Sequence, residues 1–265
     1  MGDCLKLGNA AVHSKWAMPL KRVPARPELS IVVPAFNEEG RLGPSLQRLR
    51  AFLGRRRVEV LVVDDGSTDG TVALVQAMAK RWKALRLSRL EANAGKGAAV
   101  RRGVAEARGK AILFSDADLS TPIEELPRLE AALKHGFAVV IGSRALDRAR
   151  IGVHQPFYRE VGGRAFNKVV QALTVPGIRD TQCGFKLFDA AAAKRIFSQQ
   201  QIRRFGFDVE VLYLARKAGY RIAELPVRWE NSPETKVRPV RDGLRAFLDL
   251  GLIRLYDLQG RYKGL

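Results

Sequence analysis

Two aspartates separated by one residue are the clearest candidates for chemistry in this sequence. Asp116 and Asp118 lie just after the apolar run 111–114, with Ser115 between. Residues i and i+2 of an extended chain point the same way, so the two carboxylates would lie side by side. Adjacent carboxylates repel each other unless a cation lies between them, and Mg2+ or Mn2+ takes such oxygen ligands. The pattern predicts a metal site, but an acidic turn that caps a helix would look the same, and about one such pair arises by chance in a chain this long.

Polar residues also follow two other runs that are mostly apolar. The segment Pro34–Glu38 follows the run 29–33, and the segment Asp64–Ser67 follows the run 58–63. An acid such as Asp65 at the end of a strand can accept hydrogen bonds from a base or a ribose, as in nucleotide-binding folds. The alternative is a turn closed by its own aspartate side chain.

A glycine-rich segment, Asn93-Ala-Gly-Lys-Gly97, is expected to open a helix. Glycines allow the backbone to approach a phosphate, and a helix N-terminus attracts anions, so Lys96 is a candidate phosphate-binding residue. The segment is not a P-loop, because Gly97 stands where that motif requires Ser or Thr. It also lacks the third glycine of the dinucleotide fingerprint, since residue 100 is valine. That fingerprint is only partly excluded, because an acid, Asp116, follows about 20 residues later.

Basic residues gather in two later segments. They are Arg144, Arg148, Arg150, Arg159 and Arg164 in the first, and Lys236, Arg238, Arg241 and Arg245 in the second. Either cluster could bind phosphates, or form an ordinary solvated surface.

The elements that must position these residues alternate between strands and helices over 29–142, which predicts an α/β fold with a doubly wound, mostly parallel sheet. The expected strands are 29–33, ended by Pro34, then 58–63, 84–88, 111–114 and 138–141, with later strands near 184–188 and 221–228. The expected helices are one capped by Asn37 and running towards Leu53, one capped by Ser67 or Thr68, and others at about 97–108, 121–136, 160–173, 208–218 and 237–258. Ligands bind beyond the carboxyl ends of such strands, where the three polar segments would meet.

The last expected helix is amphipathic. Its apolar stripe is Leu244, Phe247, Leu248, Leu252 and Leu255, and its basic stripe is Arg238, Arg241 and Arg245. Such a helix suits a membrane interface, but the leucines could equally pack on the sheet as core. A combination is also open, in which the leucines face inward and the arginines bind lipid headgroups or a phosphate.

Composition limits the classes of protein. The chain has 265 residues, 46 % of them hydrophobic, and 46 Lys plus Arg against 27 Asp plus Glu, a net charge of +19. This composition excludes global disorder, and the charge favours phosphate-bearing partners. Two cysteines, Cys4 and Cys183, and three histidines exclude a disulfide scaffold and a Cys/His zinc cluster.

No apolar stretch is long enough to span a bilayer, and residues 1–28 have no apolar signal core. We expect residues 1–28 to be an extension without a membrane helix, 29–236 to form the catalytic domain, and 237–265 to form the basic amphipathic helix and tail. The expected location is cytoplasmic, peripheral on the cytoplasmic face of a membrane.

Seven segments together resemble one family. Ser30–Glu39, Val63–Asp69 and Ser115–Asp118 resemble the family 2 glycosyltransferases of the GT-A fold. The resemblance narrows to the dolichyl-phosphate β-glucosyltransferases, and more loosely to the polyprenyl-phosphate mannosyltransferases, through Asn93–Gly97, Gly142–Arg144, Asp180–Lys186 and Phe207–Glu210. It covers about residues 29–258, and Asp180–Lys186 is its most specific part.

The resemblance implies a metal-dependent, inverting transfer of a hexose, expected to be glucose, from a nucleotide sugar, expected to be UDP-glucose, to a polyprenyl phosphate of dolichyl type. By the family's pattern Asp116 and Asp118 hold Mg2+ or Mn2+ on the diphosphate, and Arg144 and Arg159 meet donor or acceptor phosphates. The remaining expected substrate-binding residues are Pro34, Phe36, Glu38, Asp65, Lys96 and Lys236.

Two departures from the family matter. The eukaryotic glucosyltransferases carry an N-terminal membrane helix that residues 1–28 do not offer. The mannosyltransferases often have Gln two residues after the second acid, where this chain has Ser120.

Two alternatives remain. One keeps the fold and donor but uses a small soluble acceptor, such as a phosphorylated acid or a saccharide. The other is a basic nucleic-acid-binding protein, suggested by the net charge of +19. It is disfavoured because no zinc finger is present and the aromatic residues are not interleaved with the arginines, so nucleic acid is not an expected partner.

Overall fold

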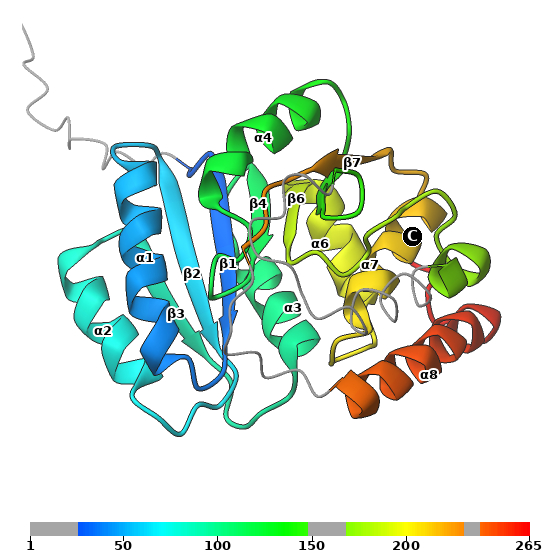
Figure 1. Cartoon of the computed structure of the whole chain (residues 1–265), viewed down its shortest axis with the longest axis horizontal. Coiled ribbons are helices and arrows are strands. Elements are labelled where there is room, and N and C mark those ends of the chain that lie inside the picture. Colours follow the sequence, from blue (N-terminus) through cyan, green and yellow to red (C-terminus); the bar gives the residue numbers. More distant parts are fainter. Residues whose placement is uncertain (1–25, 148–167, 231–238) are drawn as a thin grey trace, which may run out of the picture.

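A seven-stranded sheet runs through the molecule with helices on both faces (Figure 1), in the strand order β3-β2-β1-β4-β6-β5-β7. The computed structural model describes residues 26–147, 168–230 and 239–265, with side chains described except at 239–246. The strands are β1 Leu29–Ala35, β2 Val58–Asp64, β3 Leu85–Arg89, β4 Ala111–Ser115, β5 Val139–Ser143, β6 Phe185–Asp189 and β7 Ile222–Pro226. The helices are α1 Glu39–Leu53, α2 Thr71–Arg81, α3 Lys96–Glu106, η1 Ile123–Glu125, α4 Leu126–Lys134, α6 Ala190–Gln199, α7 Phe207–Lys217 and α8 Pro239–Leu258.

The core has two parts, one on each face of the sheet. Successive residues of a strand point to opposite faces, so Ile31 packs beneath α1 while its neighbour Val32 packs beneath α3. Both are fully buried. Burial on both faces explains why β1 and β2 are almost continuously apolar, as expected for parallel strands. The predicted doubly wound, mostly parallel sheet is confirmed.

One strand departs from the parallel pattern. β6 lies antiparallel between β4 and β5, and Phe185 at its start pairs with Ser115 at the end of β4. The chain therefore enters β6 at the edge of the sheet where the parallel strands end. This entry brings the segment 180–184 beside the turn that follows β4, where the backbone N–H of Asp116 donates to the carbonyl of Gly184 at 3.0 Å.

Several local predictions were wrong. β1 continues through Pro34 to Ala35. Its pairing with β4 ends at Val32, and beyond that point it pairs only with β2. A proline at Pro34, which has no N–H to donate, therefore removes no bond from a central ladder. The sequence analysis also missed α6, whose capping residue Asp189 accepts hydrogen bonds from the backbone N–H groups of Ala191 and Ala192.

The predicted helix caps were also wrong. Asn37 adopts a left-handed backbone conformation with φ of 54°, and α1 starts two residues later. Its side chain accepts a hydrogen bond from the backbone of Thr68, while its own backbone N–H donates to the Ser67 hydroxyl. The cap position of α2 is Gly70, which follows both predicted caps. These polar residues join the ends of β1 and β2 to each other instead of capping helices.

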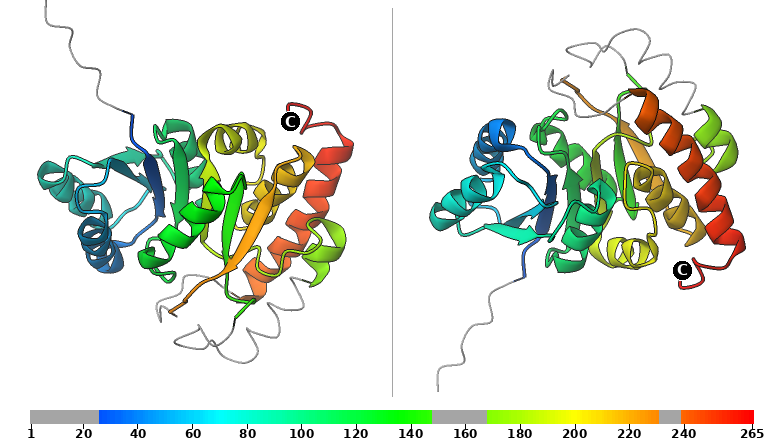
Figure 2. Two further views of the ribbon diagram at one scale, coloured as in Figure 1. Left: turned by 90° about the horizontal axis from the view of Figure 1, so that it is seen from above. Right: turned by 90° about the horizontal axis from the view of Figure 1, so that it is seen from below.

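The C-terminal helix α8 packs on α7 (Figure 2), as part of the layer that also contains α3 and α6. Among the helices that the structure describes, none combines the length and the apolar character needed to cross a bilayer.

Candidate active site

The two aspartates that follow β4 lie beside two basic side chains. The Lys96 ammonium is 2.7 Å from Asp116 Oδ1, and Arg41 Nη1 is 3.7 Å from Asp118 Oδ2. Both carboxylates remain partly open to solvent, with 35 % of the Asp116 side chain and 20 % of the Asp118 side chain exposed. A ligand from solution can therefore reach them, and cationic groups already offset their mutual repulsion.

Lys96 is the first residue of α3 and lies over the ring of Phe114, 5.1 Å from its centroid. Burial by itself would lower the pKa of its ammonium group. The negative charges of Asp116 and Asp208 outweigh that effect and raise the pKa above its usual value. Lys96 is consequently a permanent positive charge at the acid pair, suited to contact a phosphate.

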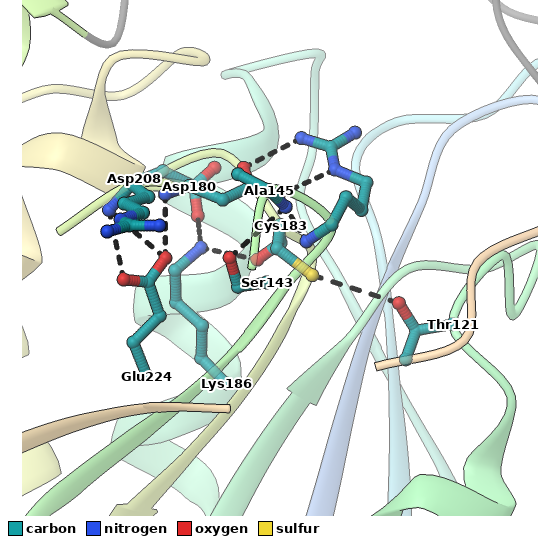
Figure 3. Close-up of polar contacts among 10 residues, drawn as sticks. Thr121, Ser143, Ala145, Asp180, Cys183, Lys186, Asp208 and Glu224 are labelled. Carbon is teal, nitrogen blue, oxygen red and sulfur yellow. Dashed lines mark hydrogen bonds and ion pairs between the residues drawn. The ribbon is translucent and has the colours of Figure 1, made fainter. Parts of the chain in front are cut away.

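Arg144 is held at the end of β5 by Asp180 (in the network of Figure 3). The Asp180 carboxylate accepts hydrogen bonds from Arg144 Nε at 2.7 Å, from Nη2 at 2.8 Å and from the backbone N–H at 2.9 Å. The Arg144 guanidinium also lies over the ring of Trp229, 5.4 Å from its centroid. Burial would raise the pKa of Asp180, but the contacts with Arg144 prevail and lower it. The arginine is thereby fixed in one orientation.

A second ion pair, between Lys186 and Asp208, is fully buried (Figure 3). Lys186 in β6 donates to the carboxylate of Asp208 in the first turn of α7, and to the carbonyl of Cys183 at 2.6 Å. Burial raises the pKa of the Asp208 carboxyl, while the charge of Lys186 opposes the shift. Burial also raises the pKa of the Cys183 thiol to about 11, so this cysteine is not a thiolate nucleophile at neutral pH.

The glycine-rich segment does not present its backbone to a ligand in the way the sequence suggested. A Cβ atom on Gly95 would lie 2.6 Å from the carbonyl oxygen of Arg203, and one on Gly97 would lie 2.8 Å from that of Ile202. The N–H of Ala98 donates to the same Arg203 oxygen at 3.0 Å. These two glycines leave room for residues 202–203, which precede α7. Lys96, between them, is the residue of the motif that contacts Asp116.

The predicted nucleoside-binding residues lie at the ends of β1 and β2. Asp65 is buried, and its carboxylate accepts hydrogen bonds from the backbone N–H groups of Ala94 and Gly95 at 2.8 and 2.9 Å. Burial raises the pKa of Asp65 although these bonds oppose the shift. Glu38 receives two hydrogen bonds from Arg41. Asp65 and Glu38 therefore shape the edge of the site, and nucleoside contact stays a prediction for both.

Pro34 is a buried residue of β1, and Phe36 is half-buried just beyond the strand. Other predicted residues lie outside the described part of the chain, namely Arg148, Arg150, Arg159, Arg164, Lys236 and Arg238, and so do the side chains of Arg241, Leu244 and Arg245. Their predicted roles stay predictions.

Sequence reasoning missed four residues of the site. Arg41 lies three residues after Glu38 on the same helical turn, a spacing that could have indicated their pairing. Asp180 and Lys186 belong to the most specific motif but received no role of their own. The side-chain nitrogen of Gln182 is buried and has no hydrogen-bond partner within the described residues, so it is a donor suited to a ligand oxygen.

The acid pair fits a divalent ion that completes its ligand shell from the substrate. Within 26–147, 168–230 and 239–265, no third His, Cys, Asp or Glu joins Asp116 and Asp118 to form a closed metal site. Mg2+ is commonly bound by one or two carboxylates together with substrate phosphates and water. Two partly exposed carboxylates supply that donor set, so these residues fit the group that the resemblance implies.

Gly184 leaves room for the Asp116 carboxylate. A Cβ atom at residue 184 would overlap that carboxylate, closer than real Cβ atoms approach any neighbour. We therefore expect Gly184→Ala to displace Asp116 and to lower catalytic activity at least about tenfold, or about 1.4 kcal/mol of transition-state stabilisation. Gly251→Ala is the control, because a Cβ atom there meets no neighbour within 4 Å and the backbone of this glycine is not in the left-handed region. An unchanged kcat/KM for Gly184→Ala would contradict this placement of Asp116.

Comparisons with known proteins agree on one family. A model described as glycosyl transferase family 2 matches residues 30–197. The dolichyl-phosphate β-glucosyltransferase of Drosophila melanogaster is 38 % identical over 252 residues, covering 89 % of this chain and 77 % of the relative. The human protein of the same description is 37 % identical over 266 residues, covering 94 % of this chain and 80 % of the relative.

Solved structures share the fold. Glucosyl-3-phosphoglycerate synthase from Mycobacterium tuberculosis, in complex with Mn2+, UDP and glucosyl-3-phosphoglycerate, superimposes with a TM-score of 0.63 at 19 % identity. The match covers 86 % of this chain and 80 % of that one. The likeness confirms the predicted GT-A arrangement.

Proposed function

Because the chain belongs to glycosyl transferase family 2, we propose that it transfers glucose from UDP-glucose to a polyprenyl phosphate of dolichyl type. The observation that carries this proposal is the match, over most of the chain, to relatives described as dolichyl-phosphate β-glucosyltransferases. The open acid pair flanked by Lys96 and Arg41 supports it, because a nucleotide sugar needs positive charge around its diphosphate.

The donor diphosphate would bind at the end of β4. Asp116 and Asp118 would hold Mg2+ or Mn2+, which stabilises the negative charge that grows on the leaving diphosphate. Lys96 adds a second positive charge at the same place, because its raised pKa keeps it protonated throughout the physiological range. The buried pair of Lys186 and Asp208 lies close to Lys96, since both lysines lie over the ring of Phe114.

The acceptor needs little help from a protein base. A phosphate monoester has a second pKa near 6, so its oxygen is already an anion at neutral pH. Asp208 and Glu210 are 1 % and 0 % exposed and are both hydrogen-bonded within the protein, so neither is available as a base. The acceptor does require positive charge from the protein, because its phosphate must lie beside the negatively charged diphosphate of the donor.

Arg144 is the described residue best suited to supply that charge. A guanidinium carries five N–H donors, and Asp180 receives two of them. Asp180 thereby orients Arg144 while the other donors remain able to bind a phosphate oxygen. In-line attack of the acceptor oxygen on the anomeric carbon would invert its configuration, giving a β-linked product from the α-linked donor. The relatives are described as β-glucosyltransferases.

The test of this proposal compares donors and acceptors directly. Purified protein with Mn2+ receives radiolabelled UDP-glucose or GDP-mannose, together with dolichyl phosphate in detergent or a small phosphorylated acid in buffer. We expect label from UDP-glucose in the organic extract, and calorimetry with Mn2+ should show tighter binding of UDP than of GDP. Label from UDP-glucose only in the water-soluble acid would overturn the acceptor, and label only from GDP-mannose would overturn the donor.

A further inference from the structure

Large apolar side chains gather on one exposed surface of the described molecule. The exposed large hydrophobic residues in the described ranges all lie on α8 or at the end of the helical residues 168–173. Figure 2 shows residues 168–173 beside α8 in both views. We call this surface the α8 apolar face, and it consists of Leu173, Phe247, Leu248, Leu252, Leu255 and Leu258.

The exposure is substantial from Phe247 to Leu258, the part of the helix whose side chains the structure describes. Leu248 is 63 % exposed, Leu255 is 45 % exposed and Leu258 is 86 % exposed. The alternative in which Phe247, Leu248, Leu252 and Leu255 pack inward as core is therefore wrong. Leu250 and Ile253, on the other side of the helix, are the residues that fill the core.

Polar contacts at its C-terminal half fix which side of α8 faces outward. The Asp257 carboxylate accepts hydrogen bonds from Tyr213 and Lys217 of α7. Beyond the helix, Tyr262 is buried and donates its hydroxyl to Glu210 at 2.7 Å. These contacts hold the helix against α7, so the leucines cannot turn inward without breaking them.

Basic side chains adjoin the apolar face. Arg254 is exposed and lies over the ring of Tyr213, and Arg261 is exposed and lies over the ring of Tyr256. Lys263 in the tail is exposed as well. Apolar side chains next to cations match a surface that offers acyl chains below anionic headgroups. A second copy of the chain fits this face poorly, because two molecules of net charge +19 repel each other.

The face lies close to the candidate active site. α8 begins at the edge of the molecule where the parallel strands end (Figure 1). A Cβ atom on Gly206 would overlap Asp249 of α8, so the chain before α7 is in close contact with this helix. That same chain covers Gly95 and Gly97, the neighbours of Lys96. A bilayer against α8 would therefore lie on the side of the molecule that carries Lys96.

We propose that the α8 apolar face docks the protein onto a membrane containing anionic lipid, with the leucines inserted among the acyl chains. The choice of a bilayer rests on the proposed function, because a polyprenyl phosphate is presented in one. The docking itself follows from exposed apolar area and charge, so it does not depend on catalysis.

Vesicle flotation tests the docking without any sugar transfer. The vesicles contain phosphatidylcholine and phosphatidylglycerol and no polyprenyl phosphate. The test variant carries Leu248→Glu, Leu252→Glu and Leu255→Glu. The matched control carries Ala73→Glu, Gln76→Glu and Ala77→Glu at exposed positions of α2, which lies at the far end of the molecule from α8 (Figure 1). Both variants lose three units of net charge, so a difference between them comes from the lost leucines and from where the charges lie, not from the change in net charge.

We expect the α8 variant to bind vesicles at least tenfold more weakly than wild type, and the α2 control to bind within twofold of wild type. Equal flotation of the two variants, or wild-type protein that does not float, would overturn the proposal. The proposal would also be overturned if sedimentation showed that the wild-type protein is a dimer, that the α8 variant is a monomer, and that neither binds vesicles. If the triple variant folds poorly, the single variant Leu258→Glu replaces it. Leu258 is the most exposed residue of the face, and this change should also weaken flotation.

Failure of docking and failure of the proposed function are separable. Glucosyl transfer to a polyprenyl phosphate dissolved in detergent does not need a bilayer, so the α8 variant should match wild type there. Transfer in detergent with no flotation would reject the docking alone. Flotation without any transfer would reject the proposed reaction and leave the docking in place.

Discussion

Replacing Asp118 with alanine is expected to lower glucosyl transfer at least about a hundredfold, or about 2.7 kcal/mol of transition-state stabilisation. Asp116 alone would then hold the divalent ion against a diphosphate, and it is already paired with Lys96. The same loss is expected for Asp116→Ala. Initial rates with UDP-glucose and dolichyl phosphate at saturating Mn2+ measure the effect.

A readout besides activity separates metal binding from a general loss of the enzyme. Calorimetric titration of UDP with and without Mn2+ should show a metal-dependent gain in affinity that both aspartate variants lose. Glu130→Ala is the control. Glu130, on α4, forms a surface ion pair with Arg56, and such pairs contribute little to stability. Full activity of Asp118→Ala in the presence of a chelator would contradict the assignment.

The second large effect concerns stability, at the buried pair of Lys186 and Asp208. Asp208→Ala leaves the Lys186 ammonium without its carboxylate in a place where both residues are almost completely buried. Breaking such a pair on one side costs about 3–5 kcal/mol, because an uncompensated charge stays in the interior. Urea unfolding followed by circular dichroism should show this decrease in the free energy of unfolding.

Two controls show whether the charge is the cause. The double variant Lys186→Met with Asp208→Leu removes both charges and should recover most of the lost stability. Glu124→Ala breaks a half-exposed pair with Arg48 and should cost less than about 1 kcal/mol. A double variant as unstable as Asp208→Ala would mean that lost packing, rather than an unpaired charge, explains the effect.

The strands, the order of elements and the acid pair could be predicted from the sequence because each depends on local pattern. Runs such as 60–63 and 111–114 are apolar throughout, since strands covered on both faces need no polar side. The position of Asp116 and Asp118 after such a run was enough to place them at the ligand-binding edge.

Contacts between distant segments could not be predicted in this way. Asn37 is a good capping residue by type, yet it bonds to Thr68, which only the pairing of β1 with β2 brings near. Gly95 and Gly97 look like phosphate-binding glycines, yet they make room for the chain at 202–203. In each case the residue type shows which contacts the residue can make. The residue that it contacts lies far away in the sequence, so the contact itself could not be predicted.

The sequence by itself determined the α/β fold, the acidic edge and the amphipathic character of the last helix, because these follow from the spacing of residue types along one segment. Only the tertiary structure decided which cations meet which acids, and which side of α8 faces outward. Lys96 and Asp116 come together because α3 packs on β1 and β2 while β4 pairs with β1. Leu250 and Ile253 take the buried side of α8 because α7 accepts them. Periodicity shows that a helix has an apolar side, but shape and polar contacts with a neighbour determine how much of it is buried.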